Sequence, residues 1–269
     1  MPGCRSSTRF ASSPNSARRG GLPATVAYCS EAGWRLSGHK IYATGIPILS
    51  WLAVWARTDG EEPRVGTFLV PAKAAGISIV ETWDHLGMRA TGSQDVILDG
   101  VEVPWDHAVD VRRPKEWSGP DAAQVGWSAL LVAALYDGIA RSARDWLVGF
   151  LQNRKPANLG AALATLPRMQ EAVGGIETLL AANTRLLRSA AFDIDVGRPP
   201  APGESGMLKS IVTNNAIAAV GAALELTGNH GVNRRNALER HHRDVVCARI
   251  HTPQDDSVRL AAGRLALQI

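Results

Sequence analysis

Length, composition and charge are those of a soluble globular protein with one large domain or two small ones. The chain has 269 residues, of which 45% are hydrophobic and 20% charged, which is ordinary for globular domains. Its formal net charge of +4 resides in the first 30 residues, where four arginines occur without an acid. The remainder is neutral overall, which argues against a basic body that binds nucleic acid.

Cysteine content and hydropathy exclude further classes of protein. Cys4, Cys29 and Cys247 are too few and too widely spaced for a disulfide framework or a paired-cysteine zinc site. The longest apolar run, Ala216–Leu224, is much shorter than a membrane span. We therefore expect a cytoplasmic protein with free thiols and no membrane contact.

Residues 1–22 form a polar lead that is rich in Ser, Arg and Gly. It has no apolar stretch of the signal-peptide kind, and it has too few large apolar side chains to bury a core. We expect this lead to be disordered or wrongly assigned as coding sequence. A transit peptide is the alternative, because the lead is Arg-rich and acid-free.

Residues 23–113 predict closely spaced β-strands. Short β-prone runs are punctuated by Gly, Pro and Asp, and no long helical period intervenes. The apolar run Leu49–Ala56 predicts a strand buried on both faces. Asp99–Gly100, between two short β-prone runs, predicts a hairpin. The segment as a whole predicts an antiparallel β-barrel or sandwich.

Residues 114–269 change to a helical period after a break that contains Pro, Gly and Trp. The apolar stripe from Val125 to Phe150 predicts a helix of about 25–30 residues. Further helices are expected at 166–196 and 204–227, and a short one after Pro253. The predicted fold class is therefore α+β and multi-domain, with the β domain followed by a helical bundle.

Several segments resemble the acyl-CoA dehydrogenase superfamily. Gly38–Thr44 resembles the family's Gly-x-Lys-x-Trp-Ile-Thr segment, and Val65–Pro104 resembles its middle-domain pattern. Gly228–Gly231 resembles in part its Gly-Gly-Asn-Gly loop, and the distance to Arg243-Asp244 is that of the family. The resemblance implies a middle β domain plus an acyl-CoA dehydrogenase-type helical bundle, without the family's N-terminal helical domain.

The resemblance also implies a flavin cofactor, FAD in the first place. In the family, the residues corresponding to Tyr42, Ala43 and Thr44 lie against the isoalloxazine ring, where an aromatic plane packs and a hydroxyl bonds a ring heteroatom. The alternative for this segment is the ordinary beginning of a strand.

The same resemblance assigns residues of the bundle to the rest of the cofactor. Arg154 and Gln170 correspond to residues that reach the flavin, usually in a neighbouring subunit, so a homodimer or homotetramer is implied. Gly228, Asn229 and Gly231 would let backbone amides approach the adenine-side phosphates. Solvated helix-end side chains and a plain helix-ending turn are the alternatives.

The family's catalytic glutamate is replaced in this sequence. That glutamate stands eight residues after the Arg-Asp aspartate, where this chain has Thr252, and some relatives carry the base near the position of Ser128. Neither side chain is an acid, and a threonine hydroxyl cannot serve as that base near neutral pH without strong assistance. Asp121 and Asp137 are the nearest carboxylates in the sequence.

The stretch around His251-Thr252 resembles a different branch of the same fold. Those proteins are flavin monooxygenases that use reduced flavin and oxygen, with a His-Thr pair beside the flavin. His251 and Thr252 are therefore the candidate catalytic residues, since histidine titrates near working pH. A structural role is the alternative for His251. No metal site is expected, because the histidines lack His-x-x-x-His spacing and acidic partners.

Three hypotheses follow from these residues. The first is an FAD-dependent oxidoreductase of the acyl-CoA dehydrogenase type, acting on the CH–CH group of an acyl-CoA-like small molecule. The second is a flavin-dependent monooxygenase of the same fold, whose FAD or FMN is reduced by a separate reductase. The third is an inactive truncated remnant that lacks the N-terminal domain.

Overall fold

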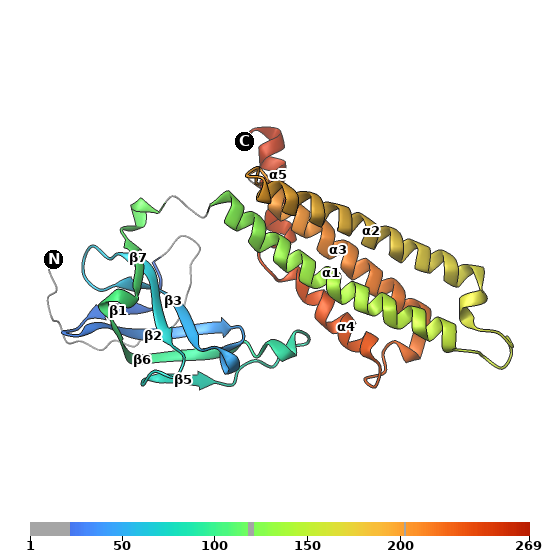
Figure 1. The fold of residues 1–269 in the computed structure, drawn as a ribbon, viewed down its shortest axis with the longest axis horizontal. Coiled ribbons are helices and arrows are strands. Elements are labelled where there is room, and N and C mark those ends of the chain that lie inside the picture. The colour runs from blue at the N-terminus through green and yellow to red at the C-terminus, as the bar shows by residue number, and fades with distance from the viewer. Residues whose placement is uncertain (1–21, 118–120, 202) are drawn as a thin grey trace. The chain divides into compact units, whose positions relative to one another are not determined.

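The computed structural model describes residues 22–117, 121–201 and 203–269, which form two compact units (Figure 1). The β unit extends to His85 and resumes at Arg89–Gly119, and the helical unit contains Leu86–Met88 and Pro120–Ile269. All but one residue of the lead 1–22 lies outside the described residues. The domain limits 1–22, 23–113 and 114–269 accordingly stay predictions.

The β unit consists of one seven-stranded sheet in the order β5-β6-β2-β1-β3-β4-β7. The strands are β1 Val26–Cys29, β2 Gly33–Ala43, β3 Trp51–Thr58, β4 Val65–Pro71, β5 Ile77–Val80, β6 Gln94–Pro104 and β7 Ala108–Arg112. Five of the six neighbouring pairs are antiparallel, and β1 runs parallel to β3. The α+β prediction is confirmed, but the described sheet is mixed and open rather than a closed antiparallel barrel.

The predicted hairpin at Asp99–Gly100 is wrong, because both residues lie within the continuous strand β6. In the pairing with β2, Leu36 faces Val101 and Gly38 faces Leu98, so two residues of β6 oppose one residue of β2. Gly100 has a φ of 64° and its N–H donates to the Ser37 hydroxyl. Asp-Gly therefore forms a β-bulge here, for which a glycine at positive φ is equally suited.

The strand β3 has one buried face, not two as its apolar sequence suggested. Leu52, Val54 and Ala56 are buried, whereas the alternate residues Trp51 and Trp55 are 52% and 40% exposed. The buried side chains join a core that lies on one face of the strands. That core comprises Ala27, Leu36, Ile46, Leu52, Val54, Ala56, Phe68, Val70, Val96, Leu98, Val101 and Val103.

In its described residues, the helical unit contains five α-helices. They are α1 Ala122–Asn153, α2 Pro167–Asp195, α3 Glu204–Thr227, α4 Ala237–Val246 and α5 Asp255–Leu267. The three long helices and the short one after Pro253 are confirmed. The sequence did not indicate α4, because its apolar face is narrow: Leu238 and Val245 are its buried residues, and charged side chains occupy most of the positions between them.

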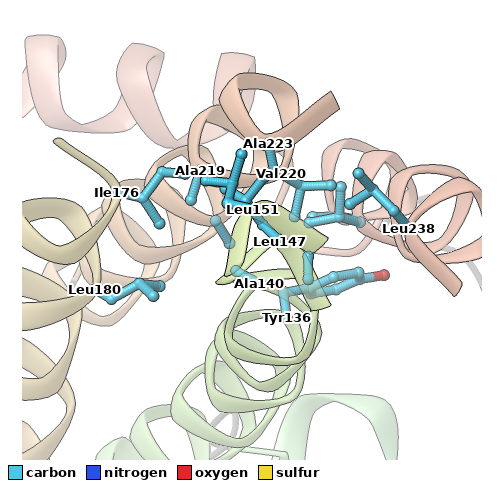
Figure 2. Packing of buried hydrophobic residues seen from close by; sticks show 14 residues of the cluster. Tyr136, Ala140, Leu147, Leu151, Ile176, Leu180, Ala219, Val220, Ala223 and Leu238 are labelled. Carbon is cyan, nitrogen blue, oxygen red and sulfur yellow. The ribbon is translucent and has the colours of Figure 1, made fainter. Parts of the chain in front are cut away.

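The bundle core lies where α1, α2 and α3 run side by side and α4 packs against α1 and α3 (Figure 1). Figure 2 shows Tyr136, Ala140 and Leu147 of α1 facing small residues of α3, among them Ala219 and Ala223. All five are at most 1% exposed. Alanine at the contact positions lets the backbones of α1 and α3 approach closely, which leaves room for the Tyr136 ring.

Two segments, α1 and 204–230, are long and apolar enough to cross a membrane by length and composition alone. In their most apolar windows, 33% and 50% of the residues are buried inside the helical unit. Core helices of soluble proteins commonly have this composition, so these segments are weak evidence for a membrane location.

Candidate functional site

The segment Tyr42–Thr44 lies at the end of β2 and leads into a tight turn. Tyr42 has a φ of 58° and is 61% exposed, so its ring lies open on the surface of the β unit. The Thr44 N–H donates to the Tyr42 carbonyl, and the Thr44 and Ser93 hydroxyls are 3.0 Å apart. Ser93 is buried, so the Thr44 side chain is held by a hydroxyl that cannot move freely.

An aromatic cluster, defined as Tyr42, Trp83 and His85, surrounds this exposed ring. Trp83 and His85 stack with ring centroids 3.8 Å apart, and Tyr42 stands edge-on to both at about 6 Å. The Gln94 side-chain carbonyl accepts the N–H of Thr82 and of Trp83, which fixes the loop that carries the cluster. The cluster therefore presents aromatic faces on a fixed loop.

His85 adds an unusual polar atom to the aromatic cluster. Its Nδ1 is buried and has no hydrogen-bond partner among the described residues. A buried polar atom without a partner is costly, so this nitrogen is a candidate hydrogen-bonding atom for a ligand. The sequence did not single out Trp83 or His85; the available signal was the pair of ring-bearing residues two positions apart in an otherwise polar loop.

A cavity of about 310 Å³ adjoins Ala43 and Thr44 within the β unit. Lys40, Trp51 and Trp55 are among its lining residues. The Lys40 ammonium donates to the Trp55 carbonyl at 2.5 Å, and burial lowers the pKa of Lys40. The end of β2 therefore adjoins both a cavity and the aromatic cluster.

His251 is the first of the two predicted catalytic residues, and one of its ring nitrogens is hydrogen-bonded to a residue of the bundle core. Its Nδ1 lies 2.5 Å from the hydroxyl of Tyr136, a fully buried residue of α1. The side chain of His251 is otherwise exposed, and Nε2 has no hydrogen-bond partner among the described residues. Burial, and next the positive charge of Lys209, lowers the pKa of His251, so the imidazole is neutral near pH 7.

Lys209 holds the backbone of the segment that carries His251. The side chain is fully buried on α3, and its ammonium donates to the carbonyls of Ala248, His251 and Pro253 at 2.9–3.1 Å. Desolvation lowers the pKa of Lys209, and the nearby Asp255 opposes that shift. The sequence signal that we missed was a lone lysine on an otherwise apolar face of an alanine-rich helix.

The carboxylates nearest in sequence to the expected base have other partners. Asp121 caps α1 through the N–H of Gln124. Asp137 is buried, and its two oxygens accept from Asn183 at 2.9 Å and from Arg141 at 2.7 Å. Both acids therefore serve the fold. Thr252 is exposed directly after His251.

Two predicted cofactor residues of the bundle, Arg154 and Gln170, lie at one of its ends, where α1 and α3 finish and α2 begins (Figure 1). The Arg154 carbonyl accepts the N–H of Leu163 at 2.9 Å, and the Gln170 amide donates to the Ala164 carbonyl at 3.0 Å. A cavity of about 380 Å³ opens beside Gln170 between α1 and α2. Arg154 itself is exposed.

The turn Gly228–Gly231 reaches the same end of the bundle through an aromatic contact. The ring of His230 lies 5.2 Å from that of Phe150, one turn before the end of α1. Gly228 has a φ of 53°, and a Cβ on Gly231 would lie 2.3 Å from the Thr227 hydroxyl. Gly228 is therefore favoured by its backbone conformation, and Gly231 by the space that the Thr227 side chain takes, whether or not a phosphate binds there.

The predicted bundle residues form two groups that are far apart within one chain. Tyr136, which contacts His251, stands 18 residues before Arg154, and the helical rise makes this separation along α1 about 27 Å. His251 and Thr252 therefore belong to a different place on the bundle from Arg154, Gln170, Gly228, Asn229 and Gly231.

The Arg-Asp pair of α4 anchors a loop that the sequence places among the strands. Arg243 donates to the Leu86 carbonyl, and Asp244 accepts the N–H of Met88 at 2.7 Å. A Cβ on Gly87 would lie 2.1 Å from the Arg243 carbonyl oxygen. Gly87 is thus required by a close backbone approach and not by a tight turn.

No group of three or more His, Cys, Asp or Glu side chains with metal-binding geometry is found in the part of the chain that the structure describes. The charged partners of Glu239 and Arg243 lie within α4, where the two side chains form a bidentate pair.

Comparison with known families agrees with this geometry. The family profile described as the acyl-CoA dehydrogenase C-terminal domain matches residues 122–261, and that of the acyl-CoA dehydrogenase middle domain matches residues 16–101. The chain therefore belongs to the acyl-CoA dehydrogenase family of flavin-binding oxidoreductases.

Similar proteins include several different activities. The chain is 35% identical to the putative acyl-CoA dehydrogenase YdbM of Bacillus subtilis, over 91% of this chain and 64% of the relative. It is 30% identical to a 3-(aryl)acrylate reductase of Clostridium sporogenes (86% and 61%) and to an L-evernosamine nitrososynthase of a Micromonospora species (79% and 52%). The chain thus spans less than two thirds of the length of these relatives.

Solved structures share the fold. KijD3 in complex with FMN and a dTDP-linked amino-keto sugar superimposes with a TM-score of 0.74 at 25% identity, over 91% of this chain and 62% of that one. A glutaryl-CoA dehydrogenase of Mycobacterium smegmatis in complex with FADH2 gives 0.76 at 21%, over 91% and 61%. Flavin-bound proteins of two kinds therefore have this architecture.

Proposed function

We propose that the protein is a flavin-dependent oxidoreductase that oxidises a small molecule with the help of His251. The observation that carries the proposal is the pairing of His251 Nδ1 with the buried Tyr136 hydroxyl, which leaves Nε2 available on an exposed side chain. Family membership supports the flavin, FAD in the first place and FMN as the alternative.

The residues at the end of β2 fit a flavin ring. Tyr42 offers an exposed aromatic plane, Thr44 a positioned hydroxyl, and His85 a buried nitrogen that lacks a partner. These are the groups that a flat, heteroatom-rich ring requires. A bound flavin would supply the two-electron redox chemistry, which no side chain of the protein supplies.

The polar group at the reaction centre favours a monooxygenase that uses reduced flavin and oxygen. A dehydrogenase needs a base to remove the proton next to the thioester carbonyl, and Thr252 stands where the family has that base. The neighbouring His251 is neutral near pH 7 and can donate one hydrogen bond from Nε2. Such a donor stabilises negative charge that develops on an oxygen atom. It does not remove a proton from a carbon atom of the substrate.

Dehydrogenation of the CH–CH group of an acyl-CoA is the second candidate. It is supported by the 35% identity to a putative acyl-CoA dehydrogenase. In that reaction His251 itself would have to act as the base, and its Nε2 could accept the proton only in the tautomer that carries its proton on Nδ1. The inactive remnant is the third hypothesis, and the flavin-binding measurement below distinguishes it from both enzymes.

We also propose that the protein works as a cytoplasmic homodimer or homotetramer. The predicted catalytic pair His251-Thr252, which α1 contacts through Tyr136, lies about 27 Å along α1 from the predicted cofactor residue Arg154, too far for both to surround the same part of one flavin within a single chain. If Arg154, Gln170 and the Gly228–Gly231 turn serve the cofactor of a second copy, the distance is explained. Analytical ultracentrifugation with and without flavin tests this proposal.

The test of the proposed function uses the purified protein loaded with flavin. Anaerobic bleaching of the oxidised flavin by an acyl-CoA indicates the dehydrogenase. Consumption of oxygen with product formation, when the flavin is supplied in reduced form by a reductase, indicates the monooxygenase. His251→Asn should lower either activity at least about 100-fold. Full activity of that variant would overturn the proposal.

A further inference from the structure

The contact between Tyr136 and His251 joins a fully buried phenol to an exposed imidazole. Tyr136 lies within the bundle core beside Ala140 and Leu147 (Figure 2), and its hydroxyl is the end of the side chain that meets the His251 ring. The ring centroids are 5.6 Å apart and tilted, so the contact is made by the hydroxyl and not by stacking of the faces.

The hydrogen-bond inventory decides which atom donates. A phenol has one O–H, and a buried O–H needs an acceptor. His251 Nδ1 is the acceptor within reach of the Tyr136 hydroxyl among the described residues. If Nδ1 carried the proton and donated to the phenol oxygen, the O–H of Tyr136 would be left without an acceptor in the core. The phenol therefore donates.

We infer that Tyr136 is a positioning residue that fixes His251 in the tautomer with its proton on Nε2. One part of the inference rests on the proposed function, namely that the Nε2–H group points toward a reacting oxygen atom. The tautomer itself is a property of this chain, independent of any substrate, because it follows from which nitrogen accepts from Tyr136.

Lys209 completes the arrangement at the backbone. It donates to the carbonyl of His251 and to those of Ala248 and Pro253 on either side. The peptide that carries the histidine is thus held by α3, and its ring is held by α1. Fixing both the backbone and one ring nitrogen defines the direction of the remaining N–H, which is what a site needs to address one atom of a substrate.

The experiment measures the ring protonation of His251 by two-dimensional long-range ¹H–¹⁵N NMR with ¹⁵N-histidine at pH 7.5. His251→Gln identifies the signals, because this exposed residue can be replaced without opening the core. In the wild-type protein we expect the Nε2–H tautomer to dominate. In Tyr136→Phe, which keeps the ring and removes only the hydroxyl, we expect a mixture of tautomers. Tyr28→Phe, on β1, is the matched control and should leave the signals unchanged.

A wild-type spectrum with the Nδ1–H tautomer overturns the inference, and so does a Tyr136→Phe spectrum identical to the wild type. If Tyr136→Phe does not fold, the Nε2–H population of wild-type His251 is compared with that of an exposed histidine of the same chain, and an equal population overturns the inference. Where a turnover assay exists, Tyr136→Phe should lower kcat at least about tenfold with little change in KM. If Tyr136→Phe does not change the tautomer ratio of His251, the inference on the tautomer is refuted. If His251 has the Nε2–H tautomer but the protein shows no turnover, only the proposed function is refuted.

Discussion

The hydroxyl of Tyr136 lies 2.5 Å from Nδ1 of His251, although the two residues are 115 positions apart in the sequence. A buried side chain of α1 thereby restrains an exposed side chain that follows α4. The contact also links stability to chemistry, because a change in the charge of His251 acts directly on the hydroxyl of a fully buried phenol.

The first prediction concerns the pH dependence of stability. Because burial and Lys209 lower the pKa of His251 in the folded protein, the unfolded chain binds more protons between that lowered value and about 6.5. The contribution of His251 is therefore fully present above pH 6.5 and is lost as the pH falls through the folded pKa. Urea unfolding of the wild type and of His251→Gln between pH 5 and 8 should show curves that converge at low pH. A gap that widens on acidification would contradict this.

The second prediction concerns Lys209. Lys209→Met keeps most of the buried side chain but leaves three backbone carbonyls without their donor, so the free energy of unfolding should fall by about 2–3 kcal/mol. The exposed Lys155 provides the control, because Lys155→Met should change stability by less than about 0.5 kcal/mol. Equal stability of the two variants would show that the carbonyl contacts do not stabilise the segment 248–253.

The third prediction concerns the loop that α4 anchors. Gly87→Ala would place a methyl group 2.1 Å from the Arg243 carbonyl oxygen, so it should destabilise the protein by about 1–3 kcal/mol. Gly138, on α1, has open space around it, and Gly138→Ala should stabilise by about 0.5–1 kcal/mol. Thermal unfolding followed by circular dichroism measures both. A neutral Gly87→Ala variant would refute the close approach.

The fourth prediction separates a structural from a catalytic role for Asp137. Both of its oxygens accept hydrogen bonds, so Asp137→Asn would turn an NH2 group toward another donor and should cost about 2–3 kcal/mol of unfolding free energy. Asp145→Asn, on the exposed side of α1 where Asp145 pairs with Arg144, should be nearly neutral. Loss of activity in Asp137→Asn without loss of stability would instead make Asp137 a candidate base.

Much of the architecture could be predicted because periodicity reports burial directly. The change from short strands to a helical period located the two kinds of structure, and α3 begins and ends at the residues that were expected. The helix α4 was not predicted, because a ten-residue helix with only two buried side chains has almost no apolar stripe. The hairpin prediction at Asp99-Gly100 was wrong because a β-bulge and a hairpin turn both favour a glycine with a positive φ.

The site could be predicted only in part, because most of its partners are remote in sequence. His251 was proposed through its similarity to known flavoproteins, and its catalytic role stays a prediction. Nothing local to it points to Tyr136 or to Lys209. Those residues are apolar-face positions on other helices, and their roles depend on how α1, α3 and the segment after α4 pack. The roles of Thr252, Arg154 and Gln170 stay predictions, as does that of the turn at Gly228–Gly231.

The measurement that tests the central claim most directly is a titration of the purified chain with FAD and with FMN, followed by flavin fluorescence. We expect saturable binding of one flavin per chain, weakened about 2- to 10-fold by Tyr42→Ala and unaffected by Val109→Ala on the exposed side of β7. Protein that leaves both flavins free at every concentration, or that binds them equally well without the Tyr42 ring, would contradict the account.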